Sequence, residues 1–305
     1  MTRASLVLVA LFAFGWALPT SAQLQVVTTT TDLGDFARTI GGERVHVETI
    51  CRGEQDPHHV QAKPSYMVTL SRADLLLSVG LQLEIGWLPS LIQGARNPDI
   101  NPGHPGFLEA ASFIQPIDVP QGPVDRSRGD VHPLGNPHYW LDPDNAKLVA
   151  SGIADRLARL DPPGAPTFKK NLAAFNARID GALARWTAAL APFRSTKVAS
   201  YHATFNYFLR RFGLTSIANL EDRPGIPPSP AHLADVVRQM RDQGVRVIFH
   251  ERYYDEAVSH LVASRTGAHV LVLATSVGGA SGVGNYEQLI DQLVNAFVQA
   301  ARGGR

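Results

Sequence analysis

Apolar segments alternate with amphipathic segments along much of the chain, as they do where helices cover a parallel sheet. Residues 24–31 and 75–79 are rich in Val, Thr or Leu, and residues 45–51 alternate apolar with polar side chains, so each segment predicts a strand. Helices are expected between them, at residues 32–40 and 64–73. This β-α-β-α-β order predicts an α/β fold with a parallel sheet.

The same alternation returns in the second half of the chain. No repeat of fixed period connects the two halves, but their shared order of strands and helices predicts two similar lobes, each with a parallel sheet covered by helices. The expected strands lie at residues 197–200, 215–218, 245–249 and 270–273. The expected helices lie at residues 203–212, 230–243, 255–266 and 286–301.

The middle of the chain is dense in Pro and Gly from residue 97 to residue 137. A short strand is expected at residues 113–119, and an exposed loop at residues 121–137. A helix is expected to follow at residues 145–160. Its apolar face is expected to hold Leu148, Val149, Ile153, Leu157 and Leu160.

The strongest helical pattern lies at residues 167–190, where large apolar side chains recur every three or four positions. At about 1.5 Å per residue this helix would be roughly 36 Å long, enough to cross the molecule. Pro166 and Pro192 bound it. We therefore expect one long helix to link the two lobes. Its packing face is expected to hold Phe168, Leu172, Phe175, Ile179, Leu183, Trp186 and Leu190.

The first residues have the pattern of an export signal. Arg3 supplies a positive charge, residues 6–18 are apolar, and the small residues at 20–22 favour cleavage after Ala22. The apolar stretch is shorter than the roughly 20 residues of a membrane-spanning helix. It has no cysteine near it, so a lipid anchor is not expected. The sequence thus predicts a signal peptide at residues 1–22 and a protein exported to the periplasm.

The rest of the chain is expected to form an N-terminal α/β lobe at residues 23–143, a helical segment with the long linking helix at 144–194, and a C-terminal α/β lobe at 195–305. A hydrophobic content of 45%, a charged content of 18% and a net charge of +1 are typical of a globular protein without a nucleic-acid partner. We expect a monomer. The single cysteine, Cys51, is expected to be buried as a small apolar side chain.

Polar residues that could bind a ligand lie at the ends of the expected segments. His58, His202 and Glu251 each follow an expected strand, and His138 ends the long loop. Ligands of open α/β sheets bind beyond the carboxyl ends of the strands. Two of these residues come from each lobe, so they predict a site in the cleft between the lobes. Three imidazoles that converge from distant segments suit Zn²⁺.

The remaining histidines have plainer interpretations. His59 is adjacent to His58, and neighbouring side chains usually point apart, so one ligand is expected from the pair. His132 lies in the exposed loop, where a solvated side chain is expected and a part in metal capture is the alternative. Surface or hydrogen-bonded roles are expected for His46, His104, His232, His260 and His269.

Motifs in series along the chain resemble the metal-binding proteins of ABC-type zinc and manganese importers. In residues 41–84 a strand leads to an Asp-Pro-His turn, a Pro-Ser helix and an Ala-Asp-Leu strand. The resemblance covers nearly the whole chain after the export signal, in order. The other matching segments are NPHYWLDPDNAKLVASGIADRLARLDP (136–162), KVASYHATFNYFLRRFGL (197–214), VIFHERYYD (247–255) and TGAHVLVL (266–273).

The resemblance places the family's metal ligands on His58, His138 and His202. Zinc-binding members have a histidine at the third position, where manganese-binding members generally have a carboxylate. Imidazole nitrogen is the softer ligand and favours Zn²⁺, so His202 implies zinc.

The fourth ligand position departs from the family's pattern. Where the family often has an aspartate, this chain has Thr275 in LATSVGG (273–279), and a threonine hydroxyl is a poor Zn²⁺ ligand. Glu251 is therefore the expected fourth ligand, or else a residue that orients a histidine. Water and another carboxylate, such as Asp222 or Asp255, are the alternatives.

These expectations predict an extracytoplasmic solute-binding protein that captures Zn²⁺ and delivers it to an ABC-type importer. Its partners would be the membrane permease and the zinc ion, with a zinc chaperone as a further candidate, and it would not be an enzyme. The alternative is an exported zinc-dependent hydrolase in which three histidines hold the metal and Glu251 is the general base. Against it, the chain has no His-Glu-x-x-His motif.

Overall fold

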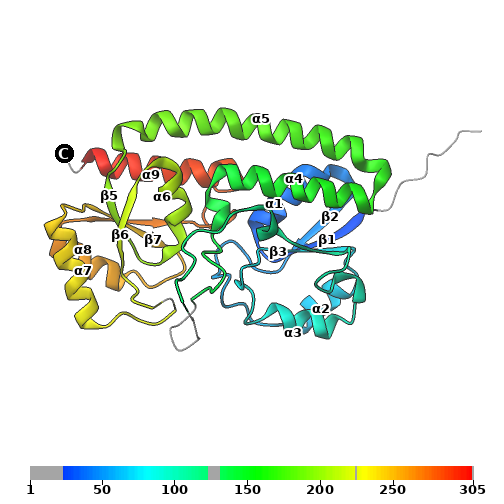
Figure 1. The fold of residues 1–305 in the computed structure, drawn as a ribbon, viewed down its shortest axis with the longest axis horizontal. Coiled ribbons are helices and arrows are strands. Elements are labelled where there is room, and N and C mark those ends of the chain that lie inside the picture. The colour runs from blue at the N-terminus through cyan, green and yellow to red at the C-terminus, as the bar shows by residue number, and fades with distance from the viewer. Residues whose placement is uncertain (1–22, 123–130, 224, 304–305) are drawn as a thin grey trace, which may run out of the picture.

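The computed structural model of the protein describes residues 23–122, 131–223 and 225–303. Within these residues the chain forms two α/β lobes that lie side by side, with one long helix along both of them (Figure 1). The predicted signal peptide at residues 1–22 lies outside the described residues. No helix in the described part of the chain has both the length and the apolar character needed to span a bilayer.

The first lobe contains a parallel sheet in the order β2-β1-β3-β4. Its strands are β1 (Leu24–Thr28), β2 (Val45–Thr49), β3 (Leu75–Ser78) and β4 (Phe107–Glu109). Its helices are α1 (Thr31–Gly41), α2 (Pro64–Ser71) and α3 (Leu88–Ala95). Leu77 packs on the α1 side of the sheet and Leu76 on the α2 and α3 side, so β3 is buried on both faces. Cys51 is buried on the α2 and α3 side, as predicted.

The second lobe repeats this arrangement with a parallel sheet in the order β6-β5-β7-β8. The strand order within each lobe is therefore the same, and the predicted pair of similar lobes is confirmed. The strands are β5 (Lys197–Ser200), β6 (Thr215–Asn219), β7 (Val247–Glu251) and β8 (His269–Leu273). The helices are α6 (Asn206–Phe212), α7 (Pro230–Asp242), α8 (Ala257–Thr266) and α9 (Tyr286–Gly303).

Two helices connect the lobes, α4 (Pro143–Leu160) and α5 (Ala165–Leu190). The 26-residue helix α5 packs against α1 and α4 on the side of the first lobe and against α9 of the second (Figure 1). Its predicted packing residues are all buried or half-buried. The expected long linking helix is confirmed.

A hydrophobic core shared by both lobes lies on the side of α4, α5 and α9. Within it, Phe36 of α1 packs edge-on against Phe175 of α5 and Tyr286 of α9, with ring centroids 5.7 and 5.1 Å apart. Two further clusters each belong to one lobe, beneath α2 and α3 and beneath α7 and α8. The lobes are thus joined through packed side chains on the α5 side.

The short strand predicted at residues 113–119 is wrong. The edge strand β4 lies earlier, at Phe107–Glu109, where it pairs with β3, and the chain then forms a 3-10 helix at Ala110–Phe113. Pro116 interrupts the predicted stretch and has no N–H to donate to a neighbouring strand. Ile114 and Ile117 still pack against the core, from irregular chain.

The apolar face predicted for α4 contains one error. Val149, Ile153 and Leu157 are fully buried, but Leu148 is 49% exposed. Adjacent residues of a helix point about 100° apart, so the neighbour of Val149 lies at the edge of the buried face. The buried face is completed by the small residues Ala146, Ala150 and Ala154.

Candidate metal centre

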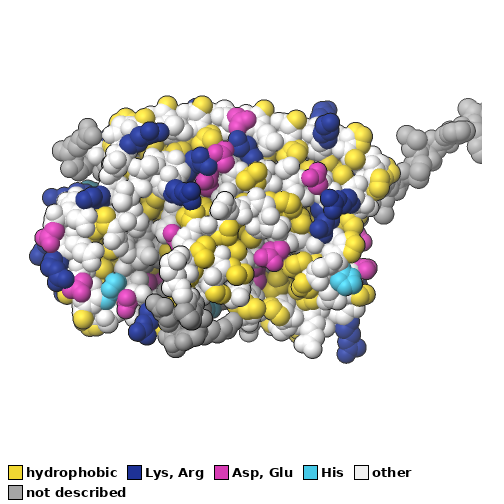
Figure 2. All heavy atoms as spheres, viewed as in Figure 1, with side chains coloured by type: hydrophobic (Ala, Val, Ile, Leu, Met, Phe, Trp, Pro, Cys, Tyr) yellow, Lys and Arg dark blue, Asp and Glu magenta, His cyan; other side chains and the backbone are white. Residues whose placement is uncertain are grey.

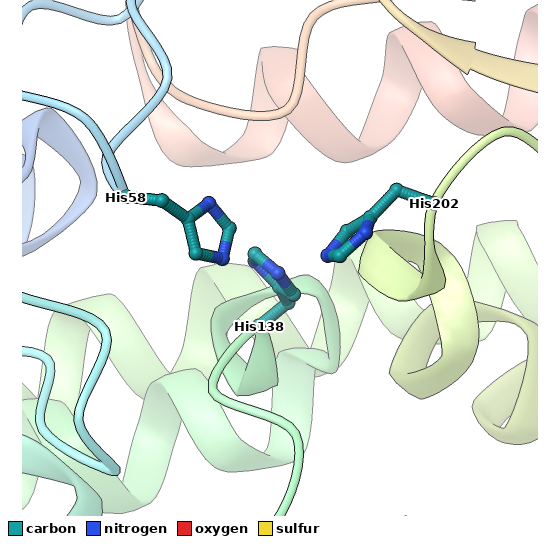
Figure 3. A group of neighbouring side chains, drawn as sticks. All are labelled: His58, His138 and His202. Atoms are coloured by element: carbon teal, nitrogen blue, oxygen red, sulfur yellow. The ribbon is translucent and has the colours of Figure 1, made fainter. Parts of the chain in front are cut away.

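Three histidine rings from different segments point toward a common centre (Figure 3). His58 lies beyond the end of β2, His138 directly precedes the 3-10 turn Tyr139–Leu141, and His202 is the second residue after β5. All three side chains are buried, and one ring nitrogen from each lies within 4.8 Å of the others. The structure therefore brings together the three histidines that the sequence singles out.

Asp56 fixes the orientation of His58. Its Oδ1 atom lies 2.7 Å from Nδ1 of the ring and also accepts the backbone N–H of His58 at 2.9 Å. Burial raises the pKa of Asp56, but these contacts with His58 outweigh burial and leave that pKa lowered. The carboxylate thus accepts a hydrogen bond from Nδ1–H, which leaves the Nε2 lone pair of His58 directed into the site.

Glu221 fixes the orientation of the His202 ring in the same way. Its Oε2 atom lies 2.9 Å from Nδ1 of the ring, and both side chains are 4% exposed. Burial lowers the pKa of His202, but the hydrogen bond to Glu221 and the negative charge of Glu251 reverse this and raise it. Glu221 follows β6, the strand next to β5, so adjacent strand ends supply the histidine and its carboxylate.

His138 has no hydrogen-bond partner on either ring nitrogen, although it is only 1% exposed. Its backbone N–H donates to the side chain of Asn136 at 2.9 Å, which holds the turn. Burial, reinforced by the charges of His58 and His202, lowers the pKa of His138 well below its usual value, so the ring is neutral. Buried polar atoms are nearly always partnered, and a metal ion at the centre would supply the missing partner.

Glu251 is the last residue of β7, since this strand ends two residues later than predicted. It is fully buried, and neither carboxylate oxygen has a hydrogen-bond partner. Burial raises its pKa to about 7, and the nearby charge of His202 opposes that rise. Among the described residues, the group of ligand atoms within 4.8 Å contains the three histidines and not Glu251. Direct ligation by Glu251 stays a prediction.

The other candidates for the fourth position lie outside the group of histidine nitrogens, as far as the described chain extends. Thr275 is buried, and its carbonyl accepts the indole N–H of Trp140 at 2.8 Å. The Asp222 side chain is 58% exposed and lies 3.9 Å from His232. Asp255 accepts the backbone N–H of Ala257 at the start of α8.

His132 is placed differently from its sequence-based interpretation. The expectation of a solvated loop residue is wrong, because the ring is half-buried and its Nε2 atom lies 3.2 Å from Nε2 of His58. Burial lowers its pKa to about 3, and the charges of His58 and His202 act in the same direction. His59, by contrast, is exposed.

Two carboxylates of the site, Asp56 and Glu221, were not predicted from the sequence. Asp56 stands two residues before His58, in the same Asp-Pro-His turn that identifies the histidine. Glu221 follows a predicted strand in the way that His58 and His202 do. A search for carboxylates at strand ends, next to candidate histidines, would have found both.

Residues 26–300 match the protein family described as zinc-uptake complex component A, periplasmic. The iron-binding protein YfeA of Yersinia pestis is 26% identical over 92% of this chain and 87% of its own length. The manganese ABC transporter substrate-binding lipoprotein PsaA of Streptococcus pneumoniae is 26% identical over 77% of this chain and 74% of its own. The zinc-binding lipoprotein AdcA of Streptococcus pneumoniae serotype 4 is 23% identical over 82% of this chain and 50% of its own.

Solved structures share the fold. The crystal structure of ZnuA has a TM-score of 0.77 at 24% identity and covers 91% of this chain and 99% of that chain. A manganese-bound periplasmic metal-binding protein from Candidatus Liberibacter asiaticus has a TM-score of 0.75 at 22% identity, with the same two coverages.

The chain belongs to the family of periplasmic zinc-uptake components, which are substrate-binding proteins of ABC-type metal importers. It is therefore an extracytoplasmic metal-binding protein and not the zinc-dependent hydrolase considered as an alternative. The three relatives are named for three different metals, iron, manganese and zinc. The choice of metal has to be argued from the ligands.

Proposed function

We propose that the protein captures Zn²⁺ in the periplasm through His58, His138 and His202 and delivers it to the permease of an ABC importer. The observation that carries this proposal is the group of three converged ring nitrogens, in which buried His138 has no other partner. Ligands of a tetrahedral Zn²⁺ ion, each about 2.0–2.1 Å from the metal, lie roughly 3.3–3.4 Å apart. A small inward movement of the rings would reach that spacing.

The ligand set favours zinc over manganese. Imidazole nitrogen suits Zn²⁺, whereas Mn²⁺ prefers oxygen ligands such as carboxylates and water. The carboxylates of Asp56 and Glu221 face the Nδ1 atoms of His58 and His202, so they hold the rings and balance the charge of the ion from outside the ligand set.

Delivery would require the permease to separate ligands that belong to different segments. His58 is carried by the first lobe and His202 by the second, so a small relative tilt of the lobes would lengthen their distance to the ion. The shared core along α5 opposes a wide opening. We expect the protein to act as a monomer, with the permease as its partner and an accessory zinc chaperone as a second candidate.

The face of the molecule in Figure 2 carries basic and acidic side chains interspersed. This is the pattern of a net charge near zero, and it gives no patch of one sign for a strongly acidic or basic partner on that face. Docking through this face is therefore expected to depend on shape and on local ion pairs rather than on long-range attraction.

Isothermal titration calorimetry of the mature protein with Zn²⁺ and Mn²⁺ tests the proposal. One Zn²⁺ ion per chain is expected, bound more tightly than Mn²⁺. Each of the variants His58→Ala, His138→Ala and His202→Ala should weaken binding by at least about 100-fold, since loss of a residue that only supports a ligand already costs about 10–100-fold. The exposed His104 provides the matched control, and His104→Ala should bind as the unaltered protein does.

Tighter binding of Mn²⁺ than of Zn²⁺ would contradict the choice of metal. Stoichiometric Zn²⁺ binding that survives all three substitutions would contradict the ligand assignment.

A further inference from the structure

A small cavity adjoins the three histidines on the side of residues 131–137, here called the His132 segment. The cavity has a volume of about 110 Å³. Three of the side chains that line it are His132, His138 and His202. A metal ion that approaches His138 through this space therefore also meets the ring of His132.

The geometry of His132 relative to His58 is that of two ligands on one ion. Their Nε2 atoms are 3.2 Å apart. Two nitrogens held about 2.0–2.1 Å from a tetrahedral Zn²⁺ ion are separated by roughly 3.3–3.4 Å, so the pair already has nearly the required spacing. Asp56 accepts a hydrogen bond from Nδ1–H of His58, which leaves the Nε2 lone pair of that ring facing Nε2 of His132.

Asn136 anchors the His132 segment between the two lobes. Its backbone N–H donates to the carbonyl of Ile117 at 2.9 Å. Its side-chain amide donates to the carbonyl of Ala203 at 2.8 Å, in the residue next to His202. The segment that carries His132 is thus tied to both walls of the site.

A tight turn at Gly135 brings His132 back toward the site. The N–H of Gly135 donates to the carbonyl of His132 at 3.1 Å, and Gly135 has a φ of 109°. A Cβ atom there would lie 2.9 Å from the carbonyl oxygen of Ile117, so both the backbone conformation and the space require glycine. This turn therefore directs the chain at residue 132 back toward the site.

Glu251 is less well placed than His132 for the fourth position. Within the described residues both side chains fall outside the group of converged histidine nitrogens, but Glu251 sits at the end of a fully buried strand that leaves it little freedom to approach. His132 already contacts one member of the group and lies on a surface segment.

We propose that His132 is the fourth ligand of the bound ion, so that the site holds Zn²⁺ with four imidazole nitrogens. This inference rests on the proposed zinc-binding function. In this arrangement Glu251 acts as a nearby buried negative charge and not as a ligand.

Zinc-edge X-ray absorption combined with titration calorimetry on the full mature protein tests the proposal. The unaltered protein and His104→Ala should show four imidazole ligands. His132→Ala and His132→Gln should each show three imidazoles and one oxygen ligand, with one Zn²⁺ per chain bound roughly 10- to 100-fold more weakly. Glu251→Gln should keep four imidazoles.

Four imidazoles and unchanged affinity in both His132 variants would overturn the assignment of His132 while leaving the zinc-binding function intact. Loss of a carboxylate oxygen from the spectrum of Glu251→Gln would overturn it in favour of Glu251. Failure of the unaltered protein to bind zinc would overturn the proposed function and the inference together.

Discussion

At the scale of single residues, the half-buried Asp56 and the buried Glu221 fix the orientation of two of the site's histidines. Asp56 and Glu221 each lie within 3 Å of an Nδ1 atom, of His58 and His202 respectively. Such contacts fix the tautomer and the direction of the ring, and they increase the basicity of the ligand nitrogen. His138 has no such partner, so no hydrogen bond fixes which of its ring nitrogens binds a metal ion.

Replacing Asp56 should weaken metal binding without removing a ligand. Asp56→Ala is expected to lower Zn²⁺ affinity by about 10- to 100-fold, because His58 loses the group that orients its ring. Asp56→Asn should lower the Zn²⁺ affinity less, since the amide oxygen still accepts a hydrogen bond from Nδ1–H of His58. Competition with a chromophoric zinc chelator measures both constants. Asp235→Asn is the control, because the Asp235 side chain is 53% exposed and takes no part in the site. Equal affinity of Asp56→Ala and the control would remove Asp56 from this role.

The sequence predicted those site residues that lie next to the end of an expected strand or turn. His58, His138 and His202 lie at strand ends or in a Pro-bounded turn, and the strand-end rule brings such residues together. His132 could not be placed in this way. Its contact, His58, is 74 residues away, and the intervening chain has no periodic pattern near the loop.

At the scale of elements, burial depends on the exact face that a helix presents. In α4 the fully buried Leu157 and the 49% exposed Leu148 are the same residue type in one helix. Periodicity alone placed both on the packed face. The structure separates them because the elements that pack on α4, among them α1 and α5, leave Leu148 half exposed.

This pair gives a matched test of packing. Leu157→Ala should lower the free energy of unfolding by about 2–5 kcal/mol, since it leaves a cavity in a close-packed core. Leu148→Ala should change it by less than about 0.5 kcal/mol, as is usual for surface positions. Urea unfolding of the metal-free protein followed by circular dichroism measures both. Comparable losses in the two variants would contradict the assigned face.

Long periodic elements were predictable and short ones were not. The pattern of α5 extends over 26 residues, so a single misplaced residue could not hide it. Helix α3 spans eight residues and was not predicted, and β4 spans three and was placed six residues too late. Short elements carry too few side chains to show a period, and β4 is defined by its pairing with β3 rather than by its own sequence.

At the scale of the whole molecule, a buried aspartate joins the lobes. Asp32, at the start of α1, accepts the backbone N–H of Val277 at 3.0 Å, and Val277 follows β8 of the other lobe. Close by, Asp35 accepts the backbone N–H of Tyr286 at 3.0 Å. Burial raises the pKa of Asp32 from 3.8 to about 7, although the hydrogen bond from Val277 opposes this.

The raised pKa of Asp32 predicts a dependence of stability on pH. Between about pH 4 and pH 7 the folded protein keeps a proton that the unfolded chain has lost, so this group's contribution to the free energy of unfolding falls as pH rises through that window. Asp32→Asn cannot ionise and keeps an oxygen acceptor for Val277. It should be more stable than the unaltered protein at pH 8, by more than about 1 kcal/mol, and the difference should shrink toward pH 4.

Urea unfolding with a metal chelator at pH 4.5 and pH 8 measures that difference. Asp235→Asn serves as the control, because the Asp235 side chain is 53% exposed. A stability difference that stays constant with pH would rule out ionisation of Asp32 as its cause.

The core shared along α5 makes the cargo a stabiliser of the entire chain. Because packed side chains tie both lobes together, neither can unfold without exposing the other's interior. Any ion that binds only the native state then raises the free energy of unfolding of the whole molecule, by about 1.4 kcal/mol for each tenfold excess of free ion over its dissociation constant. A protein that meets proteases outside the cytoplasm would thus be most resistant to them while it is loaded, and most vulnerable just after it has handed its ion over.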